Sequence, residues 1–494
     1  MADGAPIMLY NSLTRQAEPL RPLVAGEVGI YTCGPTVYSY AHLGNMRPYV
    51  FSDTLRRVLE WKGLRVRQVV NITDVGHTVG ESDLGEDKVE AAAKRELKSV
   101  REVTAHYTEA YLRDIARLNV RTPSDLPRAS DYVPQMIDFA RKLDADGFTY
   151  QLDSGLYFDT ARSPGYGTLA QISMEGQREG ARLETVPGKR NKADFAVWRT
   201  EAPGQRRVMR WESPWGPGVP GWHLECSVMS MDLLGEHFDI HTGGVDHREI
   251  HHVNEIAQSE AYLGAGRPWV PLWLHNEFVL LRNRKVAKSE GGAPLLQDLV
   301  DDGLHPLAYR YFLLTATYRS QLELTDAAVR AASSALRRLL GRAQPLRPLP
   351  AIPTLTAALD AMTTEAGRAA LHRLDEALSD DLNTPRALAD LTTALRAEEL
   401  PEGDATVLLA AAETVLGLSL DTLDPAELDG RTEVSTVDEE LRDLLAQRED
   451  ARKRRAWAES DRIRDEIAAA GWRVVDTADG PVLEAVRQRL DDEE

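Results

Sequence analysis

The chain of 494 residues contains only two cysteines, and each lies in a segment typical of a binding loop. Cys33 is followed by Gly34 and Pro35, whereas Cys226 follows the segment Gly221-Trp222-His223-Leu224-Glu225. Thiolates are strong ligands for zinc, which is usually held by four sulfur, nitrogen or carboxylate donors. Both cysteines are therefore candidate metal ligands. The alternative is that they are buried apolar side chains, as free cysteines often are.

Two further candidate ligands occur in a predicted helix over residues 250–263, which Gly264 would end. His251 and Glu255 are four residues apart, so their side chains lie on one face of that helix and can reach the same ion. This spacing alone is common, but it gains weight beside two isolated cysteines. Soft thiolate and imidazole donors favour zinc over calcium or magnesium. We predict one zinc per chain, bound by Cys33, Cys226, His251 and Glu255.

A second group of residues is suited to phosphate. His42, Gly44 and Asn45 lie where a loop enters a predicted helix, and unpaired N–H groups at a helix N-terminus attract anions. Gly44 allows close approach, while His42 and Asn45 can donate hydrogen bonds. Far downstream, Lys285 and Lys288 lie on a glycine-flanked loop that could clamp a triphosphate. Taken alone, that loop could equally be a solvated basic segment.

Composition limits the classes of protein to consider. The formal charge is −19, from 58 basic and 77 acidic residues, which disfavours non-specific coating of nucleic acid but allows a local basic footprint. No run approaches the ~20 apolar residues that span a bilayer, so we expect no membrane segment. The N-terminus lacks the pattern of a signal peptide, and two cysteines cannot build a disulfide framework. We expect a cytoplasmic protein.

The elements around Cys33 predict a βαβ unit and hence a parallel sheet. Strand-like segments at 29–31 and 66–72 flank a predicted helix that begins after Gly44 and ends near Gly63. Its inward face would carry four apolar residues: Val50, Leu55, Val58 and Leu59. A dinucleotide-type glycine fingerprint is absent from this region, which disfavours a redox cofactor.

Other segments predict the remaining organisation. Lys88 to Leu118 is a long helical stretch, and strand-like residues 238–241 precede a predicted turn, Thr242-Gly243-Gly244, close to which a ligand could lie. Helical periodicity dominates from Asp326 onward. A charged helix or helix pair is predicted over 437–470, followed by a short strand that starts at Trp472.

Taken in order along the chain, these motifs resemble those of the cysteinyl-tRNA synthetases, a family of class I aminoacyl-tRNA synthetases. His42 to Asn45 is similar to the family's HIGH motif, and Lys285 to Ser289 to its KMSKS motif. The resemblance covers nearly the full length and includes 10–15, 33–38, 71–74, 194–198, 213–216, 221–226, 251–258, 318–320 and 380–385.

The resemblance implies an α/β fold: a Rossmann-type parallel-sheet catalytic domain with an inserted connective domain, then a helical-bundle anticodon-binding domain and a small C-terminal module. The boundaries expected from it are 1–118 for the first half of the catalytic domain, 119–220 for the insertion, 221–270 for the second half, 271–325 for a stem-contact region with the KMSKS-like loop, 326–430 for the helical domain and 431–494 for a tRNA-binding module.

The resemblance also assigns roles to residues. The thiolate of the substrate cysteine would join the zinc, and because serine and alanine cannot replace a soft thiolate, no editing domain would be needed. Thr73, Trp222 and Asp246 would line the amino-acid pocket, with Asp246 facing the substrate ammonium. Gly243 and Gly244 would pass close to the adenosine.

The implied activity is that of an ATP-dependent ligase forming AMP and pyrophosphate, with L-cysteine, ATP and tRNA(Cys) as substrates. The cysteine carboxylate would attack the α-phosphate of ATP to give cysteinyl-adenylate, and a terminal ribose hydroxyl of the tRNA would then take the acyl group. His42, Asn45, Lys285 and Lys288 would surround the phosphates, and Mg²⁺ would accompany ATP. We expect a monomer.

The sequence departs from the family pattern in three places. Asn45 replaces the second histidine of HIGH, Val286 and Ala287 replace the Met and Ser of KMSKS, and the stretch from Gly76 to Asp87 is atypical. Two alternatives stay open: a cysteine ligase of the mycothiol-synthesis type, which acts on an amino sugar, and a catalytically silent RNA-binding paralogue. The C-terminal third, 326–494, favours the tRNA ligase over the first, and retention of the candidate ligands disfavours the second.

Overall fold

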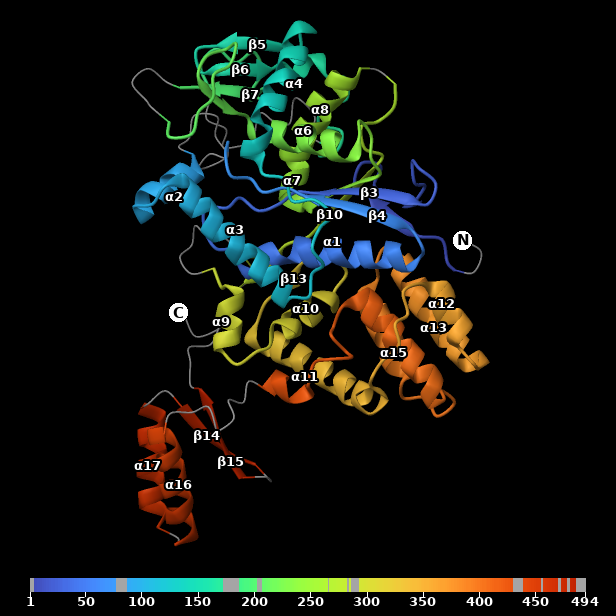
Figure 1. Cartoon of the computed structure of the whole chain (residues 1–494), viewed down its shortest axis with the longest axis vertical. Helices are drawn as coiled ribbons and strands as arrows, with labels where there is room; N and C mark the ends of the chain where they lie inside the picture. The colour runs from blue at the N-terminus through green and yellow to red at the C-terminus, as the bar shows by residue number, and fades with distance from the viewer. Residues whose placement is uncertain are drawn as a thin grey trace.

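The structure is a computed structural model. It describes the chain except for residues 1–3, 77–86, 172–185, 202–206, 265, 282–283, 286–292, 430–438, 455, 470–471, 478–479 and 486–494. In Figure 1 a small antiparallel sheet with helices lies at the top, a parallel sheet in the middle, a group of helices below it and a separate helical pair at the bottom. None of the helices within the described ranges combines the length and the apolar character that a bilayer crossing needs.

The central sheet is parallel, as the βαβ pattern predicts. Its strands are β3 (Glu27–Thr32), β4 (Arg65–Val70), β9 (Ile240–Gly244) and β10 (Leu272–Asn276), in the order β10-β9-β3-β4. The chain crosses from β4 to β9 only after the whole antiparallel sheet. Residues far apart in sequence therefore meet at the carboxyl edge of these strands, where open α/β sheets bind their ligands.

Helix α1 (Leu43–Trp61) joins β3 to β4. Val50, Leu55, Val58 and Leu59 are all buried, which confirms the predicted inward face. The helix is followed by Gly63, whose φ of +84° lies in the left-handed region that glycine adopts readily.

The predicted helix from Lys88 to Leu118 is in fact two helices, α2 (Lys88–Glu96) and α3 (Val100–Arg117). Leu97 ends the first with a left-handed backbone, φ +53°. Ser99 caps the second, accepting a hydrogen bond from the backbone N–H of Glu102, whose carboxylate in turn accepts one from the backbone N–H of Ser99. This capping box starts a new helix within an otherwise helical pattern.

The glycine pair at 243–244 is not a turn. Strand β9 starts at Ile240 and runs through both glycines, because His275 and Asn276 of β10 pair with them. Gly244 then directly precedes the short helix α7 (Val245–Glu249).

The antiparallel sheet lies within the predicted insertion. Its four strands follow chain order and pack beside two helices, of which the second in the chain also contacts strands β3 and β4 (Figure 1). These elements are β5 (Thr149–Leu152), β6 (Gly155–Phe158), β7 (Phe195–Thr200), β8 (Gly218–Pro220), α4 (Val133–Ala145) and α6 (Trp222–Leu234).

Helix α8 (His251–Leu263), between β9 and β10, ends at Gly264, as predicted. After β10 comes a three-stranded sheet in the order β12-β11-β13. Its strands and the nearby helices are β11 (Val279–Leu281), β12 (Arg284–Lys285), β13 (Leu322–Glu323), α9 (Leu296–Asp301) and α10 (Pro306–Leu314).

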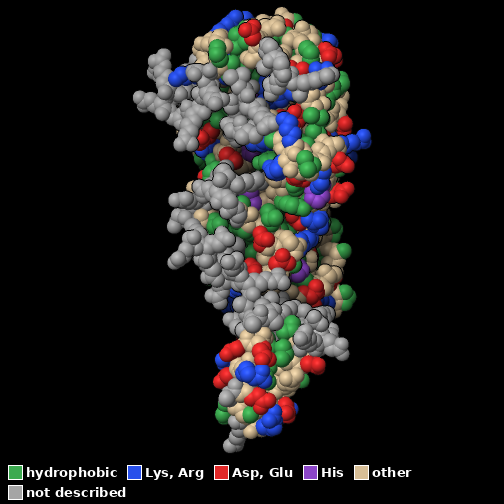
Figure 2. Space-filling view, turned by 90° about the vertical axis from the view of Figure 1, so that its left-hand side faces the viewer, with side chains coloured by type: hydrophobic (Ala, Val, Ile, Leu, Met, Phe, Trp, Pro, Cys, Tyr) green, Lys and Arg blue, Asp and Glu red, His purple; other side chains and the backbone are tan. Residues whose placement is uncertain are grey.

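Beyond residue 325 the described chain is mainly helical. The helices are α11 (Asp326–Ala343), α12 (Leu355–Ala361), α13 (Glu365–Ser379), α14 (Thr384–Ala394) and α15 (Glu402–Leu416). The C-terminal region contains the predicted helix pair, α16 (Glu439–Lys453) and α17 (Trp457–Ala469), and a hairpin of β14 (Trp472–Thr477) and β15 (Gly480–Ala485). Figure 2 shows basic and acidic side chains interspersed on this lower part. A short N-terminal hairpin, β1 (Met8–Asn11) and β2 (Gln16–Pro19), completes the strands. The domain boundaries proposed from the sequence stay predictions.

A buried ion network joins the parallel-sheet region to the helices below it. Arg310 of α10 is fully buried and donates to Asp53 of α1 at 2.6 Å and to the carbonyl of Leu416, the last residue of α15, at 2.7 Å. Arg57 also donates to Asp53, at 2.7 Å. These bonds fix α1, α10 and α15 to one another.

Replacing Arg310 with Met should destabilise the protein strongly, because it leaves the Asp53 carboxylate buried beside one cation instead of two. Loss of one partner from a buried pair costs about 3–5 kcal/mol. The control is Arg386→Met, since Arg386 and Glu376 form a pair whose side chains are 43% and 56% exposed and such pairs contribute about 0–1 kcal/mol. The midpoint of thermal unfolding should fall clearly for the first variant only, and equal midpoints would contradict this account.

Candidate active site and metal centre

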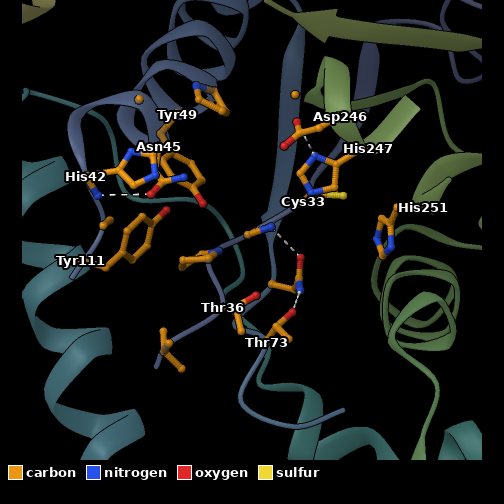
Figure 3. A pocket seen from close by; sticks show the side chains of 18 of the residues that line it. Cys33, Thr36, His42, Asn45, Tyr49, Thr73, Tyr111, Asp246, His247 and His251 are labelled. Atoms are coloured by element: carbon orange, nitrogen blue, oxygen red, sulfur yellow. Dashed lines mark hydrogen bonds and ion pairs between the residues drawn. The ribbon is translucent and has the colours of Figure 1, made fainter. Parts of the chain in front are cut away.

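A cavity of about 460 Å³ lies at the carboxyl edge of the parallel sheet. Cys33 directly follows β3, Gly244 ends β9 and Asn276 ends β10, and all three line the cavity. In Figure 3 His42 and Asn45 lie on one side of it, with Asp246, His247 and His251 on the other. Three residues of the predicted phosphate group and three of the four predicted metal ligands thus line one space, with Glu255 buried behind it: His42, Gly44, Asn45, Cys33, Cys226 and His251.

The four predicted zinc ligands are brought together. Cys33, Cys226, His251 and Glu255 are buried, and their ligand atoms all lie within 4.8 Å of one another. Cys226 is on α6, whereas His251 and Glu255 are one turn apart on α8. The His251 Nε2 atom lies 3.4 Å from the Cys226 Sγ and 2.7 Å from the Glu255 Oε1.

The sulfur and imidazole donors are spaced as around a tetrahedral zinc, whereas the 2.7 Å between His251 and Glu255 is a hydrogen-bond distance, shorter than the nitrogen–oxygen edge of about 3.3 Å that zinc would require. With Zn–S and Zn–N bonds of about 2.3 and 2.0–2.1 Å, a tetrahedron has a sulfur–nitrogen edge of about 3.5 Å, close to the distance between Cys226 and His251. The mixture of two thiolates, an imidazole and a carboxylate is also of the type that zinc accepts. The cluster can therefore bind a metal ion.

A second set of potential ligands overlaps the first and was not predicted. His252 Nε2 lies 3.1 Å from the Cys33 Sγ, and His241 Nε2 lies 2.9 Å from the other Glu255 oxygen, Oε2. Cys226 and His251 line the cavity, whereas His241 and His252 lie behind it. The set that contains Cys226 and His251 is thus the one that a ligand entering the cavity can reach. The deeper histidines can orient Cys33 and Glu255, as outer groups commonly do around metals.

Charge is compensated within this buried cluster. Burial acts to raise the pKa of Glu255, but His241 and His251 outweigh it and lower that pKa to about 2. Burial acts to lower the pKa of His251, but Glu255 and Cys33 raise it to about 10. Because histidine must be neutral to bind a metal, metal binding here would displace the proton of His251.

The predicted phosphate-binding residues lie at the start of α1. His42 is the residue before the helix, and its backbone N–H donates to the Asn45 Oδ1 at 3.2 Å (Figure 3). Asn45 returns a backbone hydrogen bond to the His42 carbonyl at 2.8 Å. The asparagine that replaces the family's histidine therefore closes the first turn. Gly44 also lines the cavity.

The residues predicted for the amino-acid pocket line the same cavity as the metal ligands: Thr73, Trp222 and Asp246. The Trp222 ring lies over His251, with 4.1 Å between ring centroids. Asp246 is on α7, immediately after β9, and its Oδ1 lies 3.6 Å from the His247 Nδ1.

Thr73 belongs to a hydrogen-bond relay that the sequence did not reveal. The Gly34 N–H donates to the Asn71 Oδ1 at 2.8 Å, the Asn71 Nδ2 donates to Thr73 at 3.0 Å, and the Thr73 hydroxyl donates to Glu225 at 3.1 Å. A Cβ atom at Gly34 would lie 1.5 Å from the Asn71 carbonyl oxygen. Only glycine therefore allows the loop after Cys33 to pack on this relay.

The structure does not place every predicted residue at the cavity. Gly244 lines it, but Gly243 packs against His252, where a Cβ atom would lie 2.7 Å from the ring. Lys285 ends β12, opposite Leu280 of β11. Lys288, Val286, Ala287 and most of the stretch from Gly76 to Asp87 lie outside the described residues.

The fold and the site define a class I aminoacyl-tRNA synthetase. A family model described as the "tRNA synthetases class I (C) catalytic domain" matches residues 19–334. Among solved structures, the ternary LeuRS-tRNA-LeuAMS complex from Agrobacterium radiobacter K84 has a TM-score of 0.53 at 12% identity, over 83% of this chain and 84% of that one. Mycobacterium tuberculosis methionyl-tRNA synthetase in complex with methionyl-adenylate gives 0.50 at 15%, over 79% and 90%. At these identities the likeness concerns the fold alone.

Relatives of higher sequence identity show which family within the class I aminoacyl-tRNA synthetases the chain matches. A cysteine–tRNA ligase from Novosphingobium aromaticivorans is 47% identical over 96% of each chain, and one from Zymomonas mobilis is 44% identical over 97% of each. A cysteine–tRNA ligase from Thermus thermophilus is 41% identical, over 96% of this chain and 98% of that one. The chain belongs to the cysteine–tRNA ligase family.

Removal of a cavity-facing ligand should remove the metal. Cys226→Ser and His251→Asn should each purify with much less than one zinc per chain, because a hydroxyl or an amide is a weaker zinc donor than a thiolate or an imidazole. His237→Asn is the control, since His237 contacts the carbonyls of Pro268 and Trp269 and belongs to neither ligand set. Metal content would be measured by elemental analysis. Undiminished zinc in Cys226→Ser would exclude Cys226 from the site.

Proposed function

We propose that the protein activates L-cysteine with ATP and transfers it to the 3′ end of tRNA(Cys). The observation that carries this proposal is the single cavity that joins a Cys/Cys/His/Glu cluster to the start of α1. One end of the cavity suits a soft side chain, and the other suits phosphate. Membership of the cysteine–tRNA ligase family supports the same pairing of substrates.

We assign zinc to Cys33, Cys226, His251 and Glu255. A zinc ion held there would already have four protein donors, so the thiolate of the substrate cysteine would bind as an additional, fifth donor, an expansion that zinc allows. The chain's own residues then complete the pocket: the Trp222 ring covers His251, and Thr73 is held by Asn71 and Glu225. Recognition of the substrate through its thiolate does not depend on the size of its side chain. Size alone would separate cysteine from other small amino acids by only about 1–3 kcal/mol.

Asp246 is suited to bind the ammonium group of cysteine. Its side chain is 45% exposed at the cavity, so it can meet a cation that enters from solvent. A carboxylate–ammonium contact would fix the α-carbon and direct the substrate carboxylate toward the helix start that holds His42 and Asn45. Binding both ends of so small a substrate aligns it for reaction.

The ATP phosphates would lie at the start of α1, with Gly44 at the close approach and Mg²⁺ accompanying the nucleotide. His42, Asn45, Lys285 and Lys288 would stabilise charge as the cysteine carboxylate attacks the α-phosphate and pyrophosphate leaves. The adenosine would lie near Gly244. In the second step a terminal ribose hydroxyl of the tRNA attacks the acyl carbon, and AMP leaves.

The amino-sugar ligase considered from the sequence is disfavoured. The cysteine–tRNA ligases match this chain over 96–97% of its length, which includes the helical region beyond residue 325. A ligase that acts on an amino sugar would not need the helical region, whereas a tRNA is large enough to reach both that region and the cavity. A monomeric state, a cytoplasmic location and tRNA contacts at 326–430 and 431–494 stay predictions.

The first step should be measurable without tRNA. The zinc-loaded protein should catalyse cysteine-dependent exchange of labelled pyrophosphate into ATP, because the adenylate forms before tRNA is used. Omission of cysteine and replacement by serine are the controls. Absence of exchange in a preparation with full zinc content would contradict the catalytic proposal and favour a silent paralogue.

The same zinc-loaded protein can be used to test which molecule accepts the activated cysteine. Transfer of labelled cysteine to tRNA(Cys), without transfer to an amino sugar, is the expected result. Transfer to the amino sugar alone would instead identify the alternative ligase.

Asp246→Asn should weaken cysteine binding while leaving zinc in place. Loss of a hydrogen bond between charged groups costs about 1.5–3 kcal/mol, so the KM for cysteine in pyrophosphate exchange should rise about ten- to a hundredfold. Glu249→Gln is the control, because Glu249 lies on the same short helix and is 60% exposed beside Arg248. An unchanged KM for cysteine would remove Asp246 from the pocket.

A further inference from the structure

Arg47 of α1 is 2% exposed and makes an unusual set of contacts for a buried cation. Its Nη1 atom donates to the carbonyls of Glu277 and Phe278, at 3.0 and 2.8 Å. Its Nη2 atom donates to the carbonyls of Thr317 and Ser320, at 3.0 and 2.7 Å. All four bonds thus go to the main chain, and they reach two segments that are far apart in sequence.

The first segment forms a wall of the cavity. Glu277, Phe278 and Val279 line it, and Val279 begins strand β11. Strand β11 pairs with β12, where Leu280 lies opposite Lys285. The first two carbonyls bound by Arg47 therefore belong to the two residues directly before the strand pair that ends at Lys285.

The second segment supports the same sheet from its other edge. Residues 317–320 precede β13, and Leu322 of β13 pairs with Val279 of β11. The Glu277 N–H also donates to the Tyr318 carbonyl at 2.8 Å, which ties the two segments together. The guanidinium accordingly lies at the junction of α1 with the whole three-stranded sheet.

The opposite end of this connection is the phosphate-binding helix start, because Arg47 is two residues after Asn45 in the first turns of α1. Burying a guanidinium without a carboxylate is costly. Burial lowers the pKa of Arg47 to about 10, so the group stays charged at neutral pH. A planar fork with several fixed donors can hold four carbonyls at once, which the compact ammonium of lysine cannot do in the same geometry.

We infer that Arg47 is a positioning residue for the ATP half of the site. It sets the distance between two parts of that half: the start of α1, which carries His42 and Asn45, and the strand pair that ends at Lys285. This inference rests on the proposed function. Arg47 does not itself contact substrate. Its effect should thus be confined to ATP binding and to the step that uses ATP, while the cysteine and metal sites keep their properties.

The test compares Arg47→Met and Arg47→Lys with Arg56→Met, in the full chain loaded with zinc. Arg56 is the matched control, because it lies on the same helix but donates to Glu60 and to the Thr122 carbonyl, away from the cavity. Cysteine-dependent pyrophosphate exchange would give KM for ATP, KM for cysteine and kcat, with active sites counted from adenylate formed in a single turnover.

For Arg47→Met we expect KM for ATP to rise at least tenfold and kcat per active site to fall, with KM for cysteine and zinc content within twofold of wild type. Arg47→Lys, which retains the charge but not the fork, should show the same pattern with a smaller rise and serves if the Met variant does not fold. Arg56→Met should match wild type.

The inference is overturned if both Arg47 variants retain a KM for ATP within twofold of wild type, even if their thermal midpoint or active fraction falls, because that would be a purely structural role. An equal loss of ATP and cysteine binding would overturn it too. Absence of exchange in the wild-type protein would instead contradict the proposed function, so the two failures can be told apart.

Discussion

The site depends on a carboxylate held in a fully buried position. Glu255 has no exposed surface, and an isolated charge there would be very costly. His251 contacts one of its oxygens and His241 the other, from α8 and β9. Because these two elements must stay in contact for the charge to be compensated, the same pairing holds α8 against the parallel sheet and places Cys33, at the end of β3, within reach of the cluster.

This constraint explains why the cavity has two chemically different ends. At one end, the Cys/Cys/His/Glu cluster combines side chains from α6, α8 and the residue after β3, whose donor atoms lie within 4.8 Å of one another. The opposite end is the first turn of α1, where Gly44 lines the cavity beside the side chains of His42 and Asn45. The two ends are fixed relative to each other because α1 is both the crossover between β3 and β4 and the helix that Arg47 and Arg310 tie to its surroundings.

The departures from the family pattern have a physical reading where the structure describes them. Asn45 uses its carbonyl oxygen to accept a hydrogen bond from the His42 backbone, which a histidine ring would have to do with a ring nitrogen. The turn is therefore preserved with a shorter side chain. The hydrogen-bond relay is a separate feature: it runs from Gly34, next to Cys33 in sequence, through Asn71 and Thr73 to Glu225, next to Cys226. The neighbours of two candidate ligands are thus linked through Thr73, a residue of the proposed amino-acid pocket.

Local sequence determined much of this protein. The inward face of α1, the end of α8 at Gly264, the βαβ unit and the one-turn spacing of His251 and Glu255 all follow from periodicity and from the residues that end helices. The division of Lys88 to Leu118 at the Ser99–Glu102 capping box is also local, although the helical periodicity on both sides hid it. Only the tertiary structure decided that Gly243 and Gly244 extend a strand, and that His241 and His252 lie behind the candidate ligands. The order β10-β9-β3-β4 brings these distant segments together, and no local pattern encodes which strands become neighbours.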